Sequence, residues 1–256
     1  MGNAIKLPKV GFVKAKIHRL PNNNWKLKSA TIFQTGDGLY FVSVIFEYEE
    51  DLDKTANFDN CIGLDYKSDG LYMDSFGNVG SDHKFYRESH KKLAKEQRRL
   101  SRKVGSKKNE TKSNNYLKQL KKVNKIHRHI ANQRLDNLHK KSNEIANRYD
   151  VVCVESLNMR DLSNKGFRNG KATMDNGYGM FLNLLSYKLH DRGKYFIKVD
   201  KWFPSSQICS LCGAKKKMPL SERAYICECG NNMDRDLNSA INIKEEGLRL
   251  LKEIVA

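Results

Sequence analysis

Four of the six cysteines of this 256-residue chain lie in one short tract, and this tract constrains the local fold more than any other feature. They form the pairs Cys209–Cys212 and Cys227–Cys229, and a glycine follows each pair. Four thiolates suit tetrahedral Zn²⁺, and a closed four-cysteine site is structural, with no open position for catalysis. The second pair is one residue shorter than the commoner C-x-x-C spacing, so its backbone geometry is tighter. The tract therefore predicts two turns that share one zinc ion.

The charge of the chain points to a polyanionic partner. The formal net charge is +18, and residues 84–148 hold 21 Lys and Arg residues against 5 Asp and Glu residues. Most charge runs are solvated helical faces, but the opposite-sign partners that such faces carry are scarce here. We therefore expect a surface for nucleic-acid phosphates. We expect no membrane association, because the longest apolar tract is too short to span a bilayer.

We assign no metal-binding or catalytic role to the remaining two cysteines or to the histidines. The chain opens without an apolar signal segment, which predicts a cytoplasmic protein, and in that reducing compartment clustered cysteines favour metal over disulfides. Cys61 and Cys153 lie inside apolar strands and are expected to be small core residues. The seven histidines are scattered, and none is assigned as a ligand.

The hydrophobic pattern changes along the chain and predicts an α/β fold with a mixed sheet. Residues 1–50 alternate as β-strands, with a hairpin turn at Gly36–Gly38. A basic helix is expected from Phe85, and a longer helix from about Tyr116 to Tyr149 completes a helical hairpin. A buried strand, an amphipathic helix and a further strand then lead into the cysteine tract and a last helix.

Three acidic residues stand at the ends of predicted elements. Asp65 ends the strand CIGLD, Glu155 ends the strand VVCVE, and Asp236 opens the helix DLNSAINI. Three carboxylates at one edge of a sheet would lose hydration and repel one another unless cations lie between them. Two Mg²⁺ ions bridged by such acids could clamp a phosphodiester in line. Each acid alone has an ordinary explanation, since Asp236 could cap its helix, and Asp234 competes with it for the third position.

Together these segments resemble the TnpB family, the RNA-guided nucleases that insertion sequences encode and that are related to the type V CRISPR effectors. The resemblance rests on IGLDYKSDGLYMDSFGN, KKLAKEQRRLSRK, IANQRLDNLHKKSNEIANRYDVVCVESLNMRDL, DNGYGMFLNLLSYKL, KVDKWFPSSQICSLCG and YICECGNNMDRDLNSAINIKEEG. These segments cover nearly everything after residue 58, in the order of the family. The early segment LPKVGFVKAKIHRL resembles the end of the family's wedge domain.

The resemblance implies an α/β, RNase H-like (RuvC) nuclease domain over residues 58–256. A helical-hairpin insertion would occupy residues 84–149 and an inserted zinc ribbon residues 205–233. A partial β-rich wedge domain would precede them at residues 1–57. Members of the family are usually much longer at the N-terminus, where the rest of the wedge and a helical recognition domain read the flanking motif and hold the guide–target duplex.

Carried over by position, the resemblance also implies the site residues. Asp65, Glu155 and Asp236 correspond to the catalytic acids that hold Mg²⁺, which leaves Asp234 as a neighbour. The four cysteines correspond to the ligands of a structural Zn²⁺: Cys209, Cys212, Cys227 and Cys229. Family members hold a guide RNA and cut DNA that pairs with it, so a guide RNA and a target DNA are the implied partners.

The leading hypothesis is a transposon-associated, RNA-guided DNA endonuclease that uses two-metal-ion hydrolysis. The alternative is a truncated derivative that binds guide RNA or DNA without cutting, as a regulator or a remnant. The intact acids argue against this alternative, and the short N-terminal part argues for it. A third reading, a DNA-strand transferase, would give joined products, whereas transposition chemistry in this family belongs to a separate protein.

Overall fold

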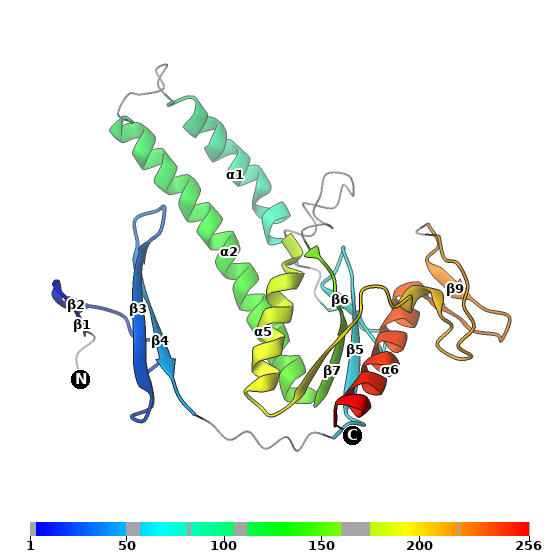
Figure 1. Ribbon diagram of the computed structural model, residues 1–256. Helices are drawn as coiled ribbons and strands as arrows, with labels where there is room; N and C mark the ends of the chain where they lie inside the picture. The colour runs from blue at the N-terminus through cyan, green and yellow to red at the C-terminus, as the bar shows by residue number, and fades with distance from the viewer. Residues whose placement is uncertain are drawn as a thin grey trace. The chain divides into compact units, whose positions relative to one another are not determined.

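The computed structural model describes residues 4–49, 57–80, 83–104, 112–159, 175–219 and 221–255. Its contacts divide the chain into two compact units, Met1–Asp51 and Leu52–Ala256. Figure 1 traces the elements of each unit along the chain. None of the helices in the described part of the chain is long and apolar enough to cross a membrane.

The first unit consists of two antiparallel β-hairpins. β1 (Ala4–Leu7) pairs with β2 (Gly11–Lys14), and β3 (Lys26–Gln34) pairs with β4 (Tyr40–Glu47). The turn between β3 and β4 lies where the sequence predicts it, and its Gly38 has a φ of 91°, which glycine adopts without strain. The alternating pattern therefore gives β-hairpins, while their interpretation as part of a wedge domain stays a prediction.

A four-stranded mixed sheet forms the centre of the second unit. The strand order is β6-β5-β7-β8. β5 (Cys61–Tyr66), β7 (Val151–Glu155) and β8 (Tyr195–Val199) are parallel, and β6 (Tyr72–Asp74) runs antiparallel to β5. Parallel strands are covered on both faces, which is why β7 is apolar up to its last residue, Glu155. The mixed α/β content that the sequence predicts is confirmed.

Helices cover the two faces of this sheet and make it the middle layer (Figure 1). α5 (Tyr178–His190) and α2 (Asn114–Arg148) pack on one face, and α6 (Arg235–Val255) packs on the other. Alternate residues of each strand supply the two cores. The first core includes Ile62, Leu64, Val152, Val154, Leu138, Phe181 and Leu185, and the second includes Cys61, Cys153, Val151, Val199, Ile243 and Leu251.

The contact between α6 and the sheet is close because small residues line it. A Cβ atom at Gly63 of β5 would overlap the carbonyl oxygen of Ala240, and one at Gly247 of α6 would overlap the sulfur of Cys153. Cys153 and Cys61 are both buried, with 3.7 Å between their sulfur atoms. They fill the space between sheet and helix as the small core residues that the sequence predicts. This packing sets where α6 begins relative to the ends of β5 and β7.

The basic segment forms a helical hairpin. α1 (Phe85–Ser101) packs against α2 through a small core of Leu93, Val123 and Ile130. α2 begins at Asn114, two residues before the predicted start, because the Ser113 hydroxyl accepts a hydrogen bond from the backbone N–H of Tyr116 (3.2 Å). A serine in this role satisfies an N–H group that the helix itself leaves unpaired.

Candidate active site and metal centre

Two of the three predicted acids are neighbours at the carboxyl edge of the sheet. In the parallel pairing of β5 and β7, Leu64 lies opposite Val154, so the following residues, Asp65 and Glu155, meet across the strands. Both have the strand parity of the residues that face α6, because successive side chains point to opposite faces of a sheet. The acids therefore lie on the α6 side of the sheet.

The third predicted acid, Asp236, lies in the first turn of α6. Burial is the largest cause of the raised pKa of Asp65, and the negative charges of Glu155 and Asp236 raise it further. The fold thus brings all three acids into one electrostatic neighbourhood from three distant segments. Their oxygens are spread more widely than the cysteine sulfurs, which form the one tight group of potential metal ligands among the described residues.

The electrostatics of the strand acids favour a cation. Burial raises the pKa of Glu155 to about 7, and it also raises the pKa of Asp65 well above the usual range of an aspartate. Within the described part of the chain, no Lys or Arg forms an ion pair with either carboxylate. Two desolvated neighbouring carboxylates keep a proton at neutral pH unless a cation offsets their charge. The pair therefore has the character of an oxygen-donor site for a divalent cation.

Asp236 has the opposite character because two cations hold it. The Nζ of Lys67 lies 2.8 Å from Oδ2 of Asp236, and a guanidinium nitrogen of Arg235 lies 3.4 Å from Oδ1. Burial pushes the pKa of Asp236 upward, but the hydrogen bond and charge of Lys67, with the charge of Arg235, outweigh it and lower the pKa. Asp236 is thus ionised, while the two strand acids resist ionisation.

The neighbouring Asp234 has a separate task at the start of α6. Its Oδ1 accepts hydrogen bonds from the backbone N–H groups of Asp236 (2.8 Å) and Leu237 (3.2 Å). This is the pattern of a helix N-cap, in which a side-chain oxygen satisfies the first free N–H groups. Of the two aspartates that compete in the sequence, Asp234 therefore caps the helix and Asp236 is left to meet Lys67.

An open cleft of about 700 Å³ lies beside Asp236. Its cations come from two sources: Lys67 follows β5, whereas Arg223 and Arg235 flank the hairpin of β9 (Ala224–Ile226) and β10 (Asn232–Asp234). The sequence reading missed these three residues, because nothing in their local spacing sets them apart from the other 44 Lys and Arg residues. Among the residues that the structure describes, the lining comprises Tyr66, Lys67, Ser68, Asp69, Arg223, Asp234, Arg235 and Asp236.

The four predicted cysteines converge at a second centre. All four sulfur atoms lie within 4.8 Å of one another, with 3.6 Å between Cys209 and Cys229 and 3.7 Å between Cys212 and Cys227. Burial would raise the pKa of Cys209, but a hydrogen bond from Asn231 and those from backbone N–H groups lower it to about 6. A set of sulfur ligands that includes a stabilised thiolate could hold a metal ion.

Buried amides connect this cysteine centre to α6. The Oδ1 of Asn238 accepts from the backbone N–H of Ser210 (3.0 Å), and its Nδ2 donates to the carbonyl oxygen of Ile208 (2.7 Å). Asn242, one turn later, donates to the same Ile208 oxygen (2.7 Å). Polar residues at positions i and i+4 in an otherwise apolar helical stripe were a usable sequence signal. The cysteine centre therefore fixes the first turns of α6, where Asp236 lies.

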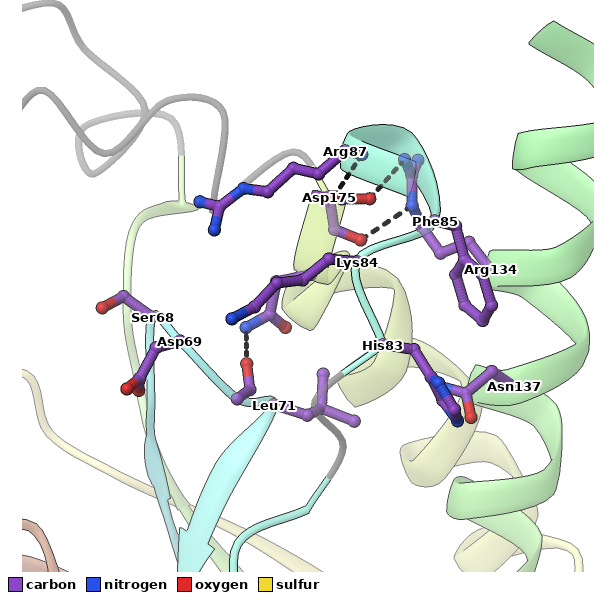
Figure 2. A pocket seen from close by; sticks show the side chains of 12 residues that line it. Ser68, Asp69, Leu71, His83, Lys84, Phe85, Arg87, Arg134, Asn137 and Asp175 are labelled. Carbon is purple, nitrogen blue, oxygen red and sulfur yellow. Dashed lines mark hydrogen bonds and ion pairs between the residues drawn. The ribbon is translucent and has the colours of Figure 1, made fainter. Parts of the chain in front are cut away.

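A buried carboxylate anchors the helical hairpin. Figure 2 shows Asp175 between the start of α1 and Arg134 of α2. The Asp175 carboxylate accepts from the backbone N–H groups of Tyr86 (2.9 Å) and Arg87 (3.4 Å), and Arg134 donates to the Asp175 carbonyl oxygen (2.9 Å). Asp175 therefore caps α1 across 89 residues of sequence, a contact that no local pattern predicts.

The next residue extends this junction to the turn after Asp65. The side-chain Nδ2 of Asn176 donates to the carbonyl oxygens of Lys67 (2.9 Å) and Gly70. Two consecutive residues, Asp175 and Asn176, thus hold the start of α1 and the β5–β6 turn. The backbone of Lys67 is consequently fixed, while its side chain crosses to α6.

The helical hairpin carries a basic groove of about 660 Å³. Both helices contribute cationic side chains to it, with Glu96 as the acidic member. Such a groove suits the phosphates of a nucleic-acid backbone, in agreement with the charge imbalance of the segment. Its cationic side chains are Lys92, Arg99, Lys122, Lys125 and Arg128.

Two family models match the chain in separate parts. A model described as "Probable transposase" (OrfB of IS605) matches residues 43–165, and a "Cas12f1-like, TNB domain" model matches residues 178–243. The first covers the segment with Asp65 and Glu155, and the second covers the cysteine centre and Asp236. The two matches therefore include every predicted site residue.

Curated relatives carry nuclease names. The chain is 32% identical over 221 residues to a "Putative RNA-guided DNA endonuclease" of Streptomyces pristinaespiralis, covering 86% of this chain and 53% of the relative. It is 30% identical over 263 residues to "Putative RNA-guided DNA endonuclease InsQ" of Escherichia coli K12, covering 96% and 63%. It is 31% identical over 149 residues to "TnpB-like protein L79" of Acanthamoeba polyphaga mimivirus, covering 54% and 28%. The chain thus spans about half to two thirds of the first two relatives.

The fold also matches a solved structure. A chain from the cryo-EM structure of a Cas12f1–sgRNA–target DNA complex aligns with a TM-score of 0.51 and 17% sequence identity. The alignment covers 86% of this chain and 46% of the Cas12f1 chain. At this identity the likeness establishes a shared fold.

Proposed function

Since this chain belongs to the TnpB family, we propose that it carries the RuvC-like nuclease site of an RNA-guided DNA endonuclease. The observation that supports this most directly is the meeting of Asp65, Glu155 and Asp236 near an open cleft whose lining carries three basic and three acidic side chains. Carboxylates gathered from two parallel strands and a following helix suit metal-assisted hydrolysis of a phosphodiester.

The donor set fits Mg²⁺ on chemical grounds. The strand acids are desolvated oxygen donors without an ion-pair partner among the described residues, and Asp236 lines the open cleft that a phosphate could enter. Bound metal would polarise the scissile phosphate and supply a nucleophile at neutral pH. Asp65 and Glu155 would hold it from the sheet, and Asp236 from α6. Arg223 and Arg235 would bind the phosphates on either side of the cut.

Zn²⁺ in the cysteine centre would have a structural role. The four sulfurs close the site, and Asn238 and Asn242 transmit its geometry to the start of α6. Zinc would therefore keep Asp236 in position rather than take part in chemistry. The basic groove of the helical hairpin would bind the backbone of the guide RNA or the target DNA.

The test is cleavage by the protein with its own RNA. We would sequence the RNA that copurifies with the zinc-loaded chain and supply a matched plasmid with Mg²⁺. We expect cutting of the matched plasmid, and we expect Asp65→Ala to reduce cutting below detection while the melting temperature stays high. The exposed Asp191→Ala, which removes an acid away from the cleft, is the control and should cut normally. Cutting by Asp65→Ala in Mg²⁺ would refute the site.

A second candidate function is binding without cleavage, as a regulator. The observation that favours it is the basic groove of the helical hairpin, which suits nucleic-acid binding and needs no metal chemistry. In that case RNA would copurify, the matched plasmid would be bound, and Mg²⁺ would not cause cutting. The same experiment therefore separates the two candidates.

A further inference from the structure

The three acids of the candidate site are unequally supplied with cations. Each carboxylate oxygen of Asp236 forms an ion pair, Oδ2 with Lys67 and Oδ1 with Arg235. Asp65 and Glu155 form no ion pair within the described part of the chain. If the three acids held a divalent cation together, Asp236 would have to offer it an oxygen, and the ammonium of Lys67 already contacts Oδ2.

Lys67 is built to reach this oxygen. It belongs to the turn that follows β5, and Asn176 fixes its backbone through the Lys67 carbonyl oxygen (2.9 Å). Its side chain is 19% exposed and that of Asp236 is 14% exposed, so the pair is sheltered from solvent. Charge-assisted hydrogen bonds in such surroundings are stronger than exposed ones. The contact is therefore a substantial barrier to a competing cation.

Lys67 also has an alternative ion-pair partner, Asp69. The carboxylate of Asp69 lies 3.9 Å from its Nζ, with 73% of the side chain exposed. Both residues line the cleft that would receive the phosphates of a substrate strand. An ammonium that leaves Asp236 would therefore stay within the cleft, between an exposed carboxylate and a phosphate.

We propose that Lys67 is a positioning residue that competes with the divalent cation for Asp236, and that phosphates in the cleft draw it away. This inference rests on the proposed function, since it concerns the same metal site. Metal and substrate strand would then favour each other's binding, because the metal releases the Lys67 ammonium for a phosphate, and a phosphate draws that ammonium off the Asp236 oxygen that the metal needs. The metal site would fill most readily when a strand is present.

Calorimetric titration of Mn²⁺ into the full, zinc-loaded chain tests this competition. Lys67→Gln removes the ammonium, and we expect it to bind Mn²⁺ about tenfold more tightly than the wild type, since a hydrogen bond to a charged group contributes on that scale. Lys194→Gln is the matched control. It breaks another sheltered Lys–Asp pair, to Asp150 at 3.0 Å, at the opposite end of the sheet, and its Mn²⁺ affinity should equal that of the wild type.

Strand coupling gives a readout that a purely structural role would not produce. A short phosphorothioate DNA strand, which resists cutting, should tighten Mn²⁺ binding by the wild type and leave Lys67→Gln unaffected. Equal or weaker Mn²⁺ binding by folded Lys67→Gln would overturn the proposal. If neither the wild type nor Lys67→Gln binds Mn²⁺, with or without the strand, the proposed metal site is wrong, and the inference falls with it.

A second variant keeps the test decisive if Lys67→Gln does not fold. Asp69→Asn changes an exposed side chain and takes away the alternative partner of Lys67, so the ammonium stays on Asp236. We expect about twofold weaker Mn²⁺ binding, the scale of an exposed ion pair. Unchanged or tighter binding by Asp69→Asn would count against the competition.

Discussion

The cysteine centre and the carboxylate site both gather groups that hold cations, but they are assembled over very different lengths of chain. The four sulfurs come from residues 209–229, whereas the carboxylates come from residues 65, 155 and 236. Their electrostatics differ as well: hydrogen bonds lower the pKa of Cys209 to about 6, while burial raises that of Glu155 to about 7. The first site is prepared for metal by its own loops, and the second depends on the packing of a sheet against α6.

The largest effect is expected from the loss of a cysteine. Cys209→Ser should abolish zinc binding and lower the free energy of unfolding by on the order of 5 kcal/mol, because metal affinity contributes directly to folding. Metal analysis and urea unfolding measure the two quantities. Cys61→Ala, which changes a cysteine outside the centre, should keep its zinc. Zinc retained at full stoichiometry by Cys209→Ser would break the distinction between the two sites.

Asn238→Ala should weaken both sites, because the buried side chain joins the cysteine centre to α6, the helix that carries Asp236. We expect about 3 kcal/mol lower stability, since the partners at Ser210 and Ile208 lose buried hydrogen bonds. Zinc should remain while Mn²⁺ affinity falls. Asn242→Ala is the comparison, because it loses bonds to Ser205 and Ile208 but lies one turn further from Asp236. A loss of Mn²⁺ affinity as large in Asn242→Ala would argue against positioning by Asn238.

The pH dependence of stability should expose the strand acids. The pKa of Glu155 is about 7 in the folded protein, against an ordinary value of 4.5. Between these values the unfolded chain has lost its proton while folded Glu155 still holds it, so stability falls as pH rises. Without added Mg²⁺ we expect Glu155 to contribute a fall of about 2 kcal/mol between about pH 5.5 and pH 8.

Urea unfolding of the zinc-loaded protein at several pH values measures this fall. Glu155→Gln should flatten it, and added Mg²⁺ should restore stability at pH 8, because the cation offsets the charge. A wild-type stability that rises steadily across this range, with no difference from Glu155→Gln, would contradict the assignment of a desolvated carboxyl.

The smallest effect concerns Asp234, which caps α6. Asp234→Ala should lower the free energy of unfolding by about 1 kcal/mol, the usual contribution of an N-cap. Asp234→Ser keeps a capping oxygen and should recover most of this loss. A stability equal to that of the wild type in Asp234→Ala would indicate that the cap contributes nothing, and that the two aspartates of this segment are not distinguished in this way.

Much of the framework could be predicted from local pattern. The mixed α/β content, the hairpin turn at Gly38 and the two buried cysteines follow from alternation, turn chemistry and apolar runs. The start of α2 was placed two residues late because the hydrophobic stripe begins after the capping serine. The loop after Glu155 lies largely outside the described residues. The domain boundaries and the roles of the site residues stay predictions.

The sequence by itself determined the cysteine cluster. It also determined that two strands carry an acidic residue near their ends, and one helix near its start, because spacing along the chain fixes local geometry. Only the tertiary structure decided which charges meet. Lys67 and Asp236 are 169 residues apart, and Asp175 caps α1 through Tyr86, which lies 89 residues before it. Such contacts arise when separate elements pack on one sheet, and no local pattern encodes the register between them. For that reason the sequence could identify Asp236 as a candidate acid, but only the tertiary structure could identify Lys67 as its partner.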